Sequence, residues 1–364
     1  MNVNYKAIIK DSASNLWEFD KVSSLAWQRF ENEVGSCRFL LPYSDTKLTN
    51  SSVQSGRGQI RIYRNDSLIW QGLVALLADS KDGTMIYGHD FLECLKWCRT
   101  REEALDGSGF EYTTKMIGSE IISPMWDLIA ARTNPPLGTL ITKGTIQDPY
   151  QVGTSTAKTI SKTFFNEDFF SFLKEAVALS RADSPSGAWK QDTAFEITLS
   201  EATPTFNFWR DVGTDKADVR LELDSEIVDF TIFEDARYIR NGIVGYTVTE
   251  DPKVLISSQV DATSRTNYYL RDICPVFGLA DKQTSLDEHT KDYLKEHKDP
   301  RKKCAFQFAS GLKPFDGYSL GDAVKVIIKR GRANIDDFYR VYGMVVNYEA
   351  GVEMTTPLLR EKRS

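Results

Sequence analysis

Residues 316–359 read DGYSLGDAVKVIIKRGRANIDDFYRVYGMVVNYEAGVEMTTPLL. The runs 323–330 and 339–350 are rich in β-branched and aromatic residues and are separated by a polar loop, so they predict two paired strands. A third short apolar stretch follows. Gly321-Asp322 stands directly before the first strand, where such a pair is compatible with catalysis, with ligand binding or with a purely architectural role.

The size and composition of the whole chain limit the possibilities. Its 364 residues exceed one typical hydrophobic core and predict two or three domains. With 41% hydrophobic and 12% aromatic residues the chain can bury substantial cores. The formal net charge of -6 argues against a dedicated nucleic-acid binder, which shows a basic face or a high pI. This charge suits a protein that stays soluble until it meets its partners.

The N-terminal region and the cysteines indicate the compartment. Residues 1–19 have neither the apolar core nor the cleavage site of a signal peptide, and no window approaches 18 uninterrupted apolar residues. We therefore expect synthesis in a reducing cytoplasm and no membrane span. The cysteines are odd in number and scattered, unlike a disulfide framework. They are Cys37, Cys94, Cys98, Cys274 and Cys304.

The first ninety residues carry β patterns. A strand that ends at Pro42 places every second residue on one face, namely Cys37, Phe39 and Leu41. Residues 60–74 predict a hairpin that turns at Asn65-Asp66, a pair that tolerates a positive φ. We expect its returning strand to end at Trp70-Gln71-Gly72, where glycine permits a bulge. Residues 84–90 predict one more strand.

At Asp90 the pattern changes to that of a helix. Asp90 is the expected N-cap, and the apolar helical face that follows comprises Phe91, Leu92, Leu95 and Cys98. Up to about residue 182 the pattern stays more helical, with its two best helices at 120–132 and 166–182 and a loop-like stretch at 153–162. Ser-Pro-Ser-Gly at 184–187 is typical of a boundary.

Residues 188–250 return to short strands separated by turn signals. A long interruption at about 256–310 contains one clear helix, 284–297, with Thr284 or Ser285 as its expected N-cap. The sequence therefore predicts a mainly β, α+β fold. Its expected parts are a β domain with an exit helix at 1–103, an α-rich middle domain at 104–187, and a second β domain at 188–364 that carries the insertion.

A metal site has one weak candidate. His89 precedes Cys94 and Cys98, and the two cysteines lie one helical turn apart. A structural zinc site needs four soft ligands, and no second cysteine pair or second histidine is near. Buried cysteine is ordinary core filling, so we expect Cys94 and Cys98 to be buried thiols beside Leu95, without metal or disulfide.

Catalytic motifs are absent from the sequence. No G-x-S-x-G elbow occurs, residues 107–115 lack the phosphate-loop spacing, and His289 and His297 lie on a charged helix where we expect solvent exposure. Neighbouring acids arise easily among 51 Asp and Glu, and a glycosidase would need two of them at a set separation in a cleft. The acid pairs are Asp224 and Glu226, Glu234 and Asp235, and Asp336 and Asp337, the last in an expected hairpin loop.

Basic and aromatic residues also have ordinary explanations. The basic run 298–303 is typical of a solvated face. Arg330 and Arg332 are positioned for phosphate contacts, but a turn that requires Gly331 explains them equally well. The isolated tryptophans are expected to anchor cores or an interface. They are Trp27, Trp70, Trp97, Trp126 and Trp189.

The order of these features resembles the phage tail hub proteins, which include the siphophage hubs and the central hubs of contractile-tail baseplates. The N-terminal matches are Asn32-x-x-Gly35, Leu41-Pro42, the hairpin Ile60–Gly72 and Gly88-x-Asp90-x-x-x-x-Leu95. The C-terminal matches are Asn241-Gly242-Ile243, the helix 284–297 and Leu320–Val324. The resemblance spans nearly the whole chain and rests on the order of the motifs. The helical middle domain of the family cannot be matched residue by residue.

The resemblance implies two β-barrel-like domains of similar topology, so that a homotrimer forms a pseudo-sixfold ring. The ring would adapt the sixfold tail tube to threefold symmetry at the tail tip or baseplate of a virion and let the genome leave. Implied partners are a distal tail or tail-tube protein above, the C-terminus of the tape measure in the lumen, and tip, spike or receptor-binding proteins below. DNA would pass transiently and without specific contacts.

In this interpretation Gly321-Asp322 is architectural, because glycine supplies a φ that other residues resist and aspartate bonds backbone amides. No catalytic, cofactor-binding or metal-binding residue is expected, and no enzyme activity. Two alternatives remain open: a tail-associated cell-wall hydrolase, and a module that binds host carbohydrate through an exposed tryptophan.

Overall fold

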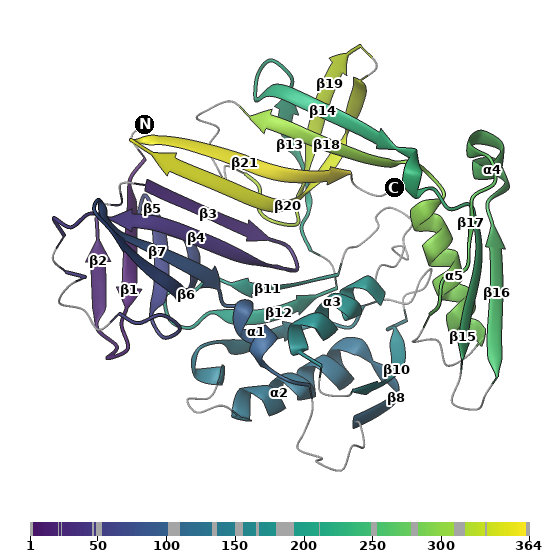
Figure 1. The fold of residues 1–364 in the computed structure, drawn as a ribbon, viewed down its shortest axis with the longest axis horizontal. Coiled ribbons are helices and arrows are strands. Elements are labelled where there is room, and N and C mark those ends of the chain that lie inside the picture. The colour runs from purple at the N-terminus through teal and green to yellow at the C-terminus, as the bar shows by residue number, and fades with distance from the viewer. Residues whose placement is uncertain are drawn as a thin grey trace. The chain divides into compact units, whose positions relative to one another are not determined.

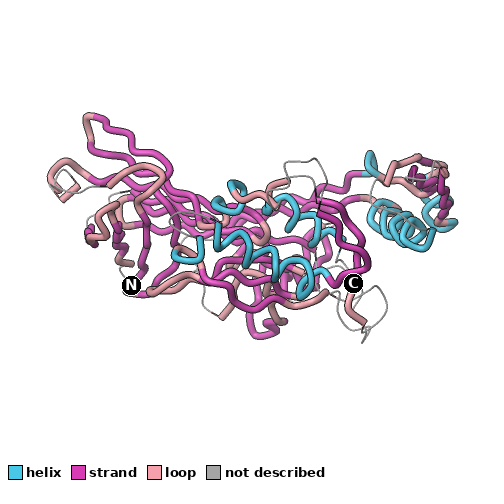
Figure 2. Tube along the Cα trace, turned by 90° about the horizontal axis from the view of Figure 1, so that it is seen from below, coloured by secondary structure: helices cyan, strands magenta, loops and turns pink. Residues whose placement is uncertain are grey.

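The computed structural model describes residues 3–20, 22, 24–45, 47–48, 53–100, 110–132, 137–149, 156–164, 167–179, 193–210, 212–248, 253–277, 283–308, 317–331 and 333–361. Strands form most of this part of the chain and helices are fewer (Figure 1, Figure 2). The strands are arranged in several sheets. The predicted class, a mainly β, α+β fold with a helix-containing insertion, is confirmed.

The largest sheet combines strands from both ends of the chain. Their order is β13-β19-β20-β3-β4-β7-β6-β5-β1-β2, and β21 pairs with β20 beside this path. The N-terminal members are β1 (Tyr5–Lys10), β2 (Leu16–Phe19), β3 (Ser24–Phe30), β4 (Glu33–Leu41), β5 (Gln59–Arg64), β6 (Ser67–Ser80) and β7 (Gly83–Asp90). The later members are β13 (Asp215–Glu222), β19 (Ala323–Arg330), β20 (Ala333–Glu349) and β21 (Val352–Glu361).

The junction of the two ends is the antiparallel pair β3 and β20, in which Trp27 lies opposite Val346. From β20 the sheet passes through β3, β4, β7, β6 and β5 before it reaches β1. Nevertheless Tyr5 on β1 contacts Tyr348 on β20, with ring centroids 4.8 Å apart. The sheet is therefore strongly rolled, as the twist of adjacent strands allows.

The predicted hairpins form, with two corrections. Asn65 and Asp66 have φ values of 47° and 63° and make the turn between β5 and β6, as expected. The returning strand does not end at Gly72 but continues to Ser80, with register shifts between Leu68 and Trp70 against β5 and between Val74 and Leu76 against β7. Gly72 is needed there because a Cβ would lie 2.1 Å from a backbone oxygen of β7. Cys37, Phe39 and Leu41 are all buried, as predicted.

The last hairpin also differs from the prediction in one respect. β19 matches the predicted run 323–330, but β20 begins at Ala333 instead of 339, and the two strands are joined at Gly331, with φ 61°. Asp336 and Asp337 consequently lie inside β20 and not in a loop, opposite Ile327 and Val326. The cross-strand partners of Asp336 explain this, because Lys325 and Lys329 on β19 neutralise it.

A second core packs helices against a small sheet, β11 (Ala194–Thr198), β12 (Thr205–Trp209) and β9 (Thr142–Ile146). At its centre Trp126 stacks on Phe206 with ring centroids 4.4 Å apart. The helices are α1 (Glu93–Trp97), the π-helical η1 (Ile117–Ile122), α2 (Ser123–Arg132), the short 3-10 turn η2 (Leu137–Thr139) and α3 (Phe169–Leu179). The two predicted long helices are thus present as η1 with α2 and as α3.

Beside this core β8 (Phe110–Met116) pairs with β10 (Thr159–Phe164). The stretch 153–162, expected to be a loop, therefore contains the start of a strand. The predicted boundary at 184–187 and Trp189 lie outside the described residues.

The chain divides into two compact units. Unit 1 comprises 1–230 and 306–364, and unit 2 comprises 231–305. The paired strands β14 (Ile227–Asp235) and β18 (Arg301–Phe308) carry the chain from one unit to the other. In unit 2, β15 (Gly242–Val248) lies between β16 (Val254–Val260) and β17 (Asp272–Ile273). Its helices are η3 (Ala236–Tyr238), α4 (Ala262–Tyr268) and α5 (Gln283–His297).

Helix α5 confirms the helix predicted in the insertion. It begins at Gln283, so Thr284 and Ser285 lie in its first turn and are not its N-cap. None of the helices in the described part of the chain is long and apolar enough to cross a membrane.

Candidate functional site

The pair Gly321-Asp322 forms a buried junction between two distant segments. Asp322 Oδ1 accepts from the backbone N–H of Thr214 at 2.7 Å, and Oδ2 accepts from the N–H of Ser319 at 2.8 Å. Gly321 has φ 90°, and a Cβ there would lie 2.3 Å from Val212. The carboxylate therefore holds backbone amides in a turn that only glycine fits, which is the architectural role predicted from the sequence.

Two N-terminal motifs are also joined by a carboxylate. Asp90 accepts from the N–H of Gly35 at 2.6 Å and from the N–H of Leu92 at 3.0 Å, ahead of α1. Burial raises the pKa of Asp90 to about 7, although both amides favour the ionised form. Asn32, in the turn before Gly35, has φ 58° and accepts from the N–H of Phe195 on β11. The motif around Asn32 thus connects the rolled sheet with the second core.

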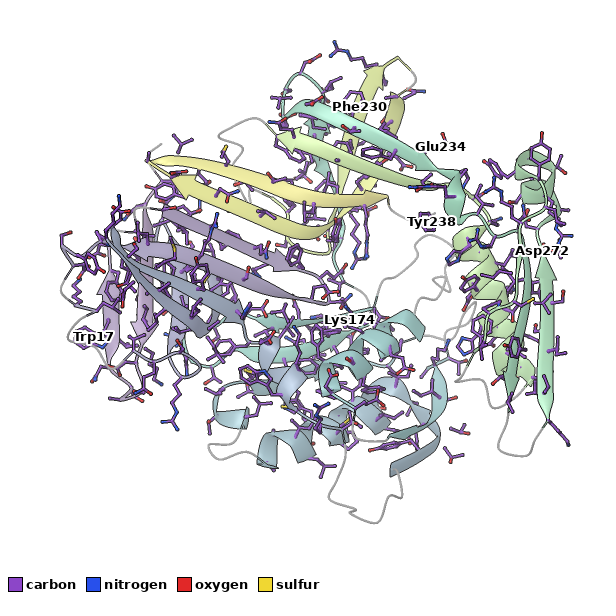
Figure 3. The ribbon with its side chains drawn as sticks, in the orientation of Figure 1. Trp17, Lys174, Phe230, Glu234, Tyr238 and Asp272 are labelled. Carbon is purple, nitrogen blue, oxygen red and sulfur yellow. The ribbon has the colours of Figure 1, made fainter. Side chains whose placement is uncertain are left out.

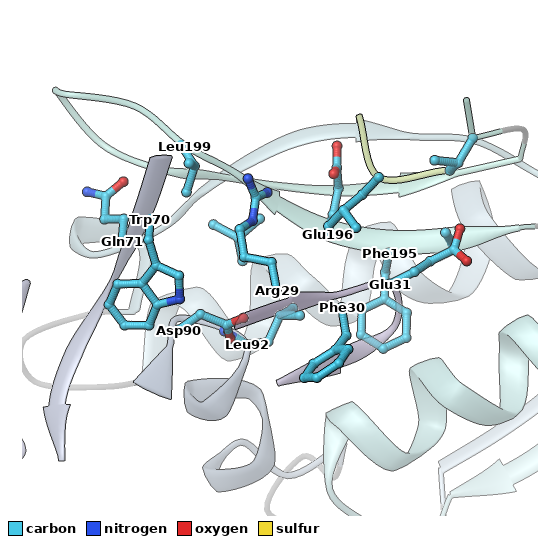
Figure 4. Close-up of a pocket in the computed structure, with 14 residues that line it drawn as sticks. Arg29, Phe30, Glu31, Trp70, Gln71, Asp90, Leu92, Phe195, Glu196 and Leu199 are labelled. Atoms are coloured by element: carbon cyan, nitrogen blue, oxygen red, sulfur yellow. The ribbon is translucent and has the colours of Figure 1, made fainter. Parts of the chain in front are cut away.

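A cavity in unit 1 lies next to Asp90 and Phe195 (Figure 4). Arg29 on β3 projects into it, between Asp90 on β7 and Glu196 on β11. Burial lowers the pKa of Arg29, while the two acids act in the opposite direction. The cavity adjoins a groove of about 620 Å³ that Arg29 and Glu196 also line. Apolar lining residues of the groove include Trp27, Leu199, Trp209, Leu320 and Met344.

The cavity contains two hydrogen-bond donors, of which Arg29 is half-buried and Gln71 is buried. In the described part of the chain no hydrogen bond or ion pair reaches the guanidinium of Arg29. Gln71 is 1% exposed and its Nε2 has no acceptor, while its Oε1 accepts from Ser200. Glu196 is engaged by the indole N–H of Trp209 at 3.0 Å. The cavity therefore combines a guanidinium and an amide donor with three carboxylates, those of Glu31, Asp90 and Glu196.

The metal candidates are not brought together. His89 is exposed on β7, whereas Cys94 and Cys98 are buried in the second core. Cys98 Sγ contacts the carbonyl oxygen of Cys94 at 3.3 Å, and Leu95 belongs to the same core. Burial raises the pKa of Cys94 to about 12 and that of Cys98 to about 11, so both remain unreactive thiols at neutral pH. Their predicted burial beside Leu95 is confirmed.

Each candidate pair of acids contains at least one residue with a structural task. Glu226 accepts from the backbone N–H of Glu222 in the turn that contains Asp224, which has φ 68°. Asp235 caps η3 by accepting from the N–H of Arg237 and pairs with its guanidinium. Glu234 is exposed on β14 (Figure 3). No pair lines the cavity or the groove described above.

The histidines of α5 were predicted to be solvent-exposed, which is wrong. Both are half-buried. His289 stacks on Phe277 at 5.8 Å, and His297 stacks on Tyr293 at 4.1 Å. Aromatic neighbours on α5 and in the preceding segment cover the rings, which the charge pattern of the helix did not reveal.

The basic and aromatic candidates divide into anchors and exposed residues. Lys298 pairs with Asp261 at 3.0 Å, and Arg330 lies beside Asp224 at 3.9 Å next to the Gly331 turn. Trp27, Trp70 and Trp126 are buried anchors, as predicted. Trp97 is 61% exposed and does not anchor a core. Arg332 lies outside the described residues, and the side chain of Cys304 is not described.

The sequence pattern missed the residues of the cavity. Arg29 and Glu196 lie on strands whose polar positions look solvated when each strand is read alone. Gln71 gave one signal, because it stands between buried Trp70 and Gly72 in an otherwise apolar strand. Only the pairing of distant strands shows that the three side chains line one cavity.

Comparison with known proteins identifies the fold. No model of a known protein family and no curated protein matches the chain. Among solved structures, the 43 kDa tail protein of prophage MuSo2 from Shewanella oneidensis matches with a TM-score of 0.64 and 12% identity, covering 97% of both chains. A tail protein from Neisseria meningitidis MC58 matches with a TM-score of 0.63 and 12% identity, covering 98% of this chain and 97% of that one.

A third structure agrees with these two. The prophage tail protein gp18 from Listeria monocytogenes EGD-e matches with a TM-score of 0.58 and 11% identity, covering 99% of this chain and 95% of that one. The similarity covers 95% to 99% of each chain, so residues of both units contribute to the shared fold.

Proposed function

Because the chain has the fold of prophage and phage tail proteins, we propose that it is a structural tail hub protein that acts at the tail tip or baseplate of a phage or phage-derived particle. The observation that carries the proposal is coverage of 95% to 97% of three tail proteins by nearly all of this chain. The tail-hub motifs of the sequence support it, since Asp90 accepts a hydrogen bond from Gly35 and Asp322 holds the turn before β19.

In the proposed assembly three copies form a ring that adapts sixfold tube symmetry to threefold symmetry and lets the genome leave. A distal tail or tube protein lies above it, the tape measure ends in the lumen, and tip, spike or receptor-binding proteins attach below. The division at 1–103, 104–187 and 188–364, with two β-barrel-like domains of similar topology, stays a prediction. Superposing 1–100 on 188–360 without the insertion, in an experimental structure of the ring, tests it.

Electron cryomicroscopy of intact particles, with antibody labelling of this chain, tests the proposal directly. We expect a threefold density at the distal end of the tail tube. Labelling only along the tube or on the capsid would contradict it.

The proposal assigns no catalytic residue. The donors of the cavity and the occupied acids support a structural role rather than hydrolysis. A zymogram on host cell wall discriminates the two functions. A clearing zone that is lost in Asp336→Asn would favour a cell-wall hydrolase.

Carbohydrate binding is a second candidate function, because Trp97 is exposed and its ring can stack on a sugar. Glycan binding by the purified chain that is lost in Trp97→Ala, but kept in Leu76→Ala, would favour a carbohydrate-binding module. Leu76 is a matched control because it is also a large exposed apolar side chain, at 53% against 61% for Trp97.

A further inference from the structure

The sheet of unit 2 has one covered face and one open face. Helix α5 covers the first: a Cβ added to Gly245 on β15 would lie 2.4 Å from Thr290 Oγ1 on α5 (Figure 1). Because side chains alternate along a strand, the neighbours of Gly245 point to the opposite face. The antiparallel register places Val244, Tyr246 and Val248 on β15 beside Ser258, Ile256 and Val254 on β16. Val260 continues this face opposite Gly242.

This open face is apolar and exposed. Val248, Val254 and Ile256 are 64%, 58% and 59% exposed. Four residues of β15 and four of β16 form the open face, and none of these eight is charged. Its five exposed aliphatic side chains present roughly 400 Å² of apolar surface, the size of the largest patch on a typical monomer and often functional. A polar rim begins at its end, where Arg265 pairs with Asp272 at 2.6 Å (Figure 3).

Unit 2 has a small hydrophobic core. In the described part of the unit, the apolar side chains that are fully buried are Ile239, Ile243, Leu286 and Leu294. Ten large apolar side chains of the same unit are exposed. A unit of this size is marginal when it has so small a core, so covering the open face would stabilise it appreciably.

The edge of the sheet is also open. β16 pairs with β15 on one side, and within the described residues its other side has no strand partner, although Gln283 at the start of α5 donates to the carbonyl oxygen of Ile256 at 3.0 Å. Its sequence, VLISSQV, contains neither a charge nor a proline, which are the features by which soluble proteins protect an exposed edge. An uncharged edge strand beside an apolar face therefore favours contact with another surface.

We propose that a second copy of this chain covers the open face of β15 and β16, as part of the contact between neighbours in the ring. The inference rests on the proposed ring, because a ring of identical copies presents the same surfaces to each neighbour. The lack of charge on the face disfavours nucleic acid and strongly charged protein partners. Two surfaces of this size bury roughly 800 Å², below the 1,200 Å² of a stable interface, so the face is one part of a larger contact.

The test measures association of the full chain by analytical ultracentrifugation over a range of concentrations. Ile256→Lys and Val248→Lys place a charge on the open face, and Leu76→Lys is the matched control, since Leu76 is 53% exposed in unit 1. We expect the two unit 2 variants to raise the dissociation constant of the trimer at least tenfold and the control to change it less than twofold. Hydrogen exchange should show protection of 254–260 in the trimer and loss of it in the dilute monomer.

The melting temperature of the monomer shows whether a second copy or the chain itself covers the open face. Because both side chains are exposed, the proposal expects the variants to melt as the wild-type monomer does. Variants that melt earlier and still form trimers would show that the chain covers the face itself, and would overturn the proposal. An equal loss of trimer in Leu76→Lys would also overturn it. A wild-type trimer that is unaffected by Ile256→Lys refutes this contact alone, whereas a wild-type chain that is monomeric at every concentration refutes the ring as well.

Discussion

Tyr5 donates a hydrogen bond from its hydroxyl group to the carboxylate of Glu353, 348 residues later in the chain. The same carboxylate accepts from Arg64 on β5, with Nε at 2.8 Å and Nη2 at 3.0 Å. Burial, next the hydrogen bond to Glu353 and then the negative charge of Glu353 raise the pKa of Tyr5 well above its usual value, so its hydroxyl remains a donor at all physiological pH values. One buried acid thus fixes the position of β21 relative to β1 and β5.

Removal of this acid should destabilise the protein strongly. Glu353→Ala leaves Arg64 and Tyr5 without their acceptor in a site where the Arg64 side chain is only 17% exposed. We expect a loss of about 3 kcal/mol in the free energy of unfolding, measured by urea denaturation. The control is Lys174→Ala, which breaks the exposed pair with Glu33 (Lys174 is labelled in Figure 3) and should change stability by less than about 1 kcal/mol. Equal effects of the two variants would contradict the proposed role of Glu353.

Two glycines in the left-handed region separate backbone strain from steric clash. Gly321→Ala combines a positive φ with a Cβ 2.3 Å from Val212 and should cost about 3 kcal/mol. Gly331→Ala has a positive φ but no atom within 4 Å of the added Cβ, so it should cost about 1 kcal/mol. Thermal unfolding of the two variants measures the difference. If Gly331→Ala were the more destabilising change, the packing around Gly321 would be assigned incorrectly.

The raised pKa of Asp90 gives stability a defined dependence on pH. The folded chain binds the proton more tightly than the unfolded chain, whose aspartate has a pKa near 3.8. Its stabilising contribution is therefore complete below that pH and is lost as the pH rises to about 7, with a limiting slope of about 1.4 kcal/mol per pH unit. The difference in unfolding free energy between wild type and Asp90→Asn should fall between pH 4 and 7, measured by urea denaturation. Exposed Asp82→Asn is the control, and a pH-independent difference for Asp90→Asn would refute the prediction.

The assembled ring should bind DNA weakly. Each Lys or Arg contact to phosphate adds affinity that slows passage, and a chain with net charge -6 permits a lumen in which acids outnumber bases. Fluorescence anisotropy with duplex DNA should show binding that disappears between 50 and 200 mM salt, on the order of the loss expected for a few phosphate contacts. Tight binding at physiological salt, or a lumen lined mainly by Lys and Arg, would remove the idea.

The sequence predicted well those features that are determined by residues close to one another in the chain. The turn at Asn65 and Asp66 follows from the φ values that these two residues tolerate, and α5 follows from its own periodicity. The bonds of Asp322 were anticipated in kind, because an aspartate beside a glycine bonds backbone amides nearby. Its second partner, Thr214, lies 108 residues away and no local pattern indicates it.

The missed features depend on partners that are distant in sequence. Gly72 was expected to end a strand because glycine permits a bulge, but β7 approaches it too closely for any other residue. Asp336 was expected in a hairpin loop, but it lies inside β20, where Lys325 and Lys329 on β19 pair with it. The cavity around Arg29 forms only where β3, β7 and β11 meet. In each case the outcome depends on which distant strands lie side by side, and not on the secondary-structure preference of the local sequence.

The junction of β3 with β20 also sets a schedule for synthesis. Phe30 must wait for Gly343 to leave the ribosome before the two strands can pair, an interval of roughly 15 to 60 s at ordinary rates of translation. Throughout that interval the β3 edge of the nascent sheet has no partner and is open to aggregation. A chain that terminates before Gly343 never acquires that neighbour, so an incomplete product keeps an unpaired β3 edge.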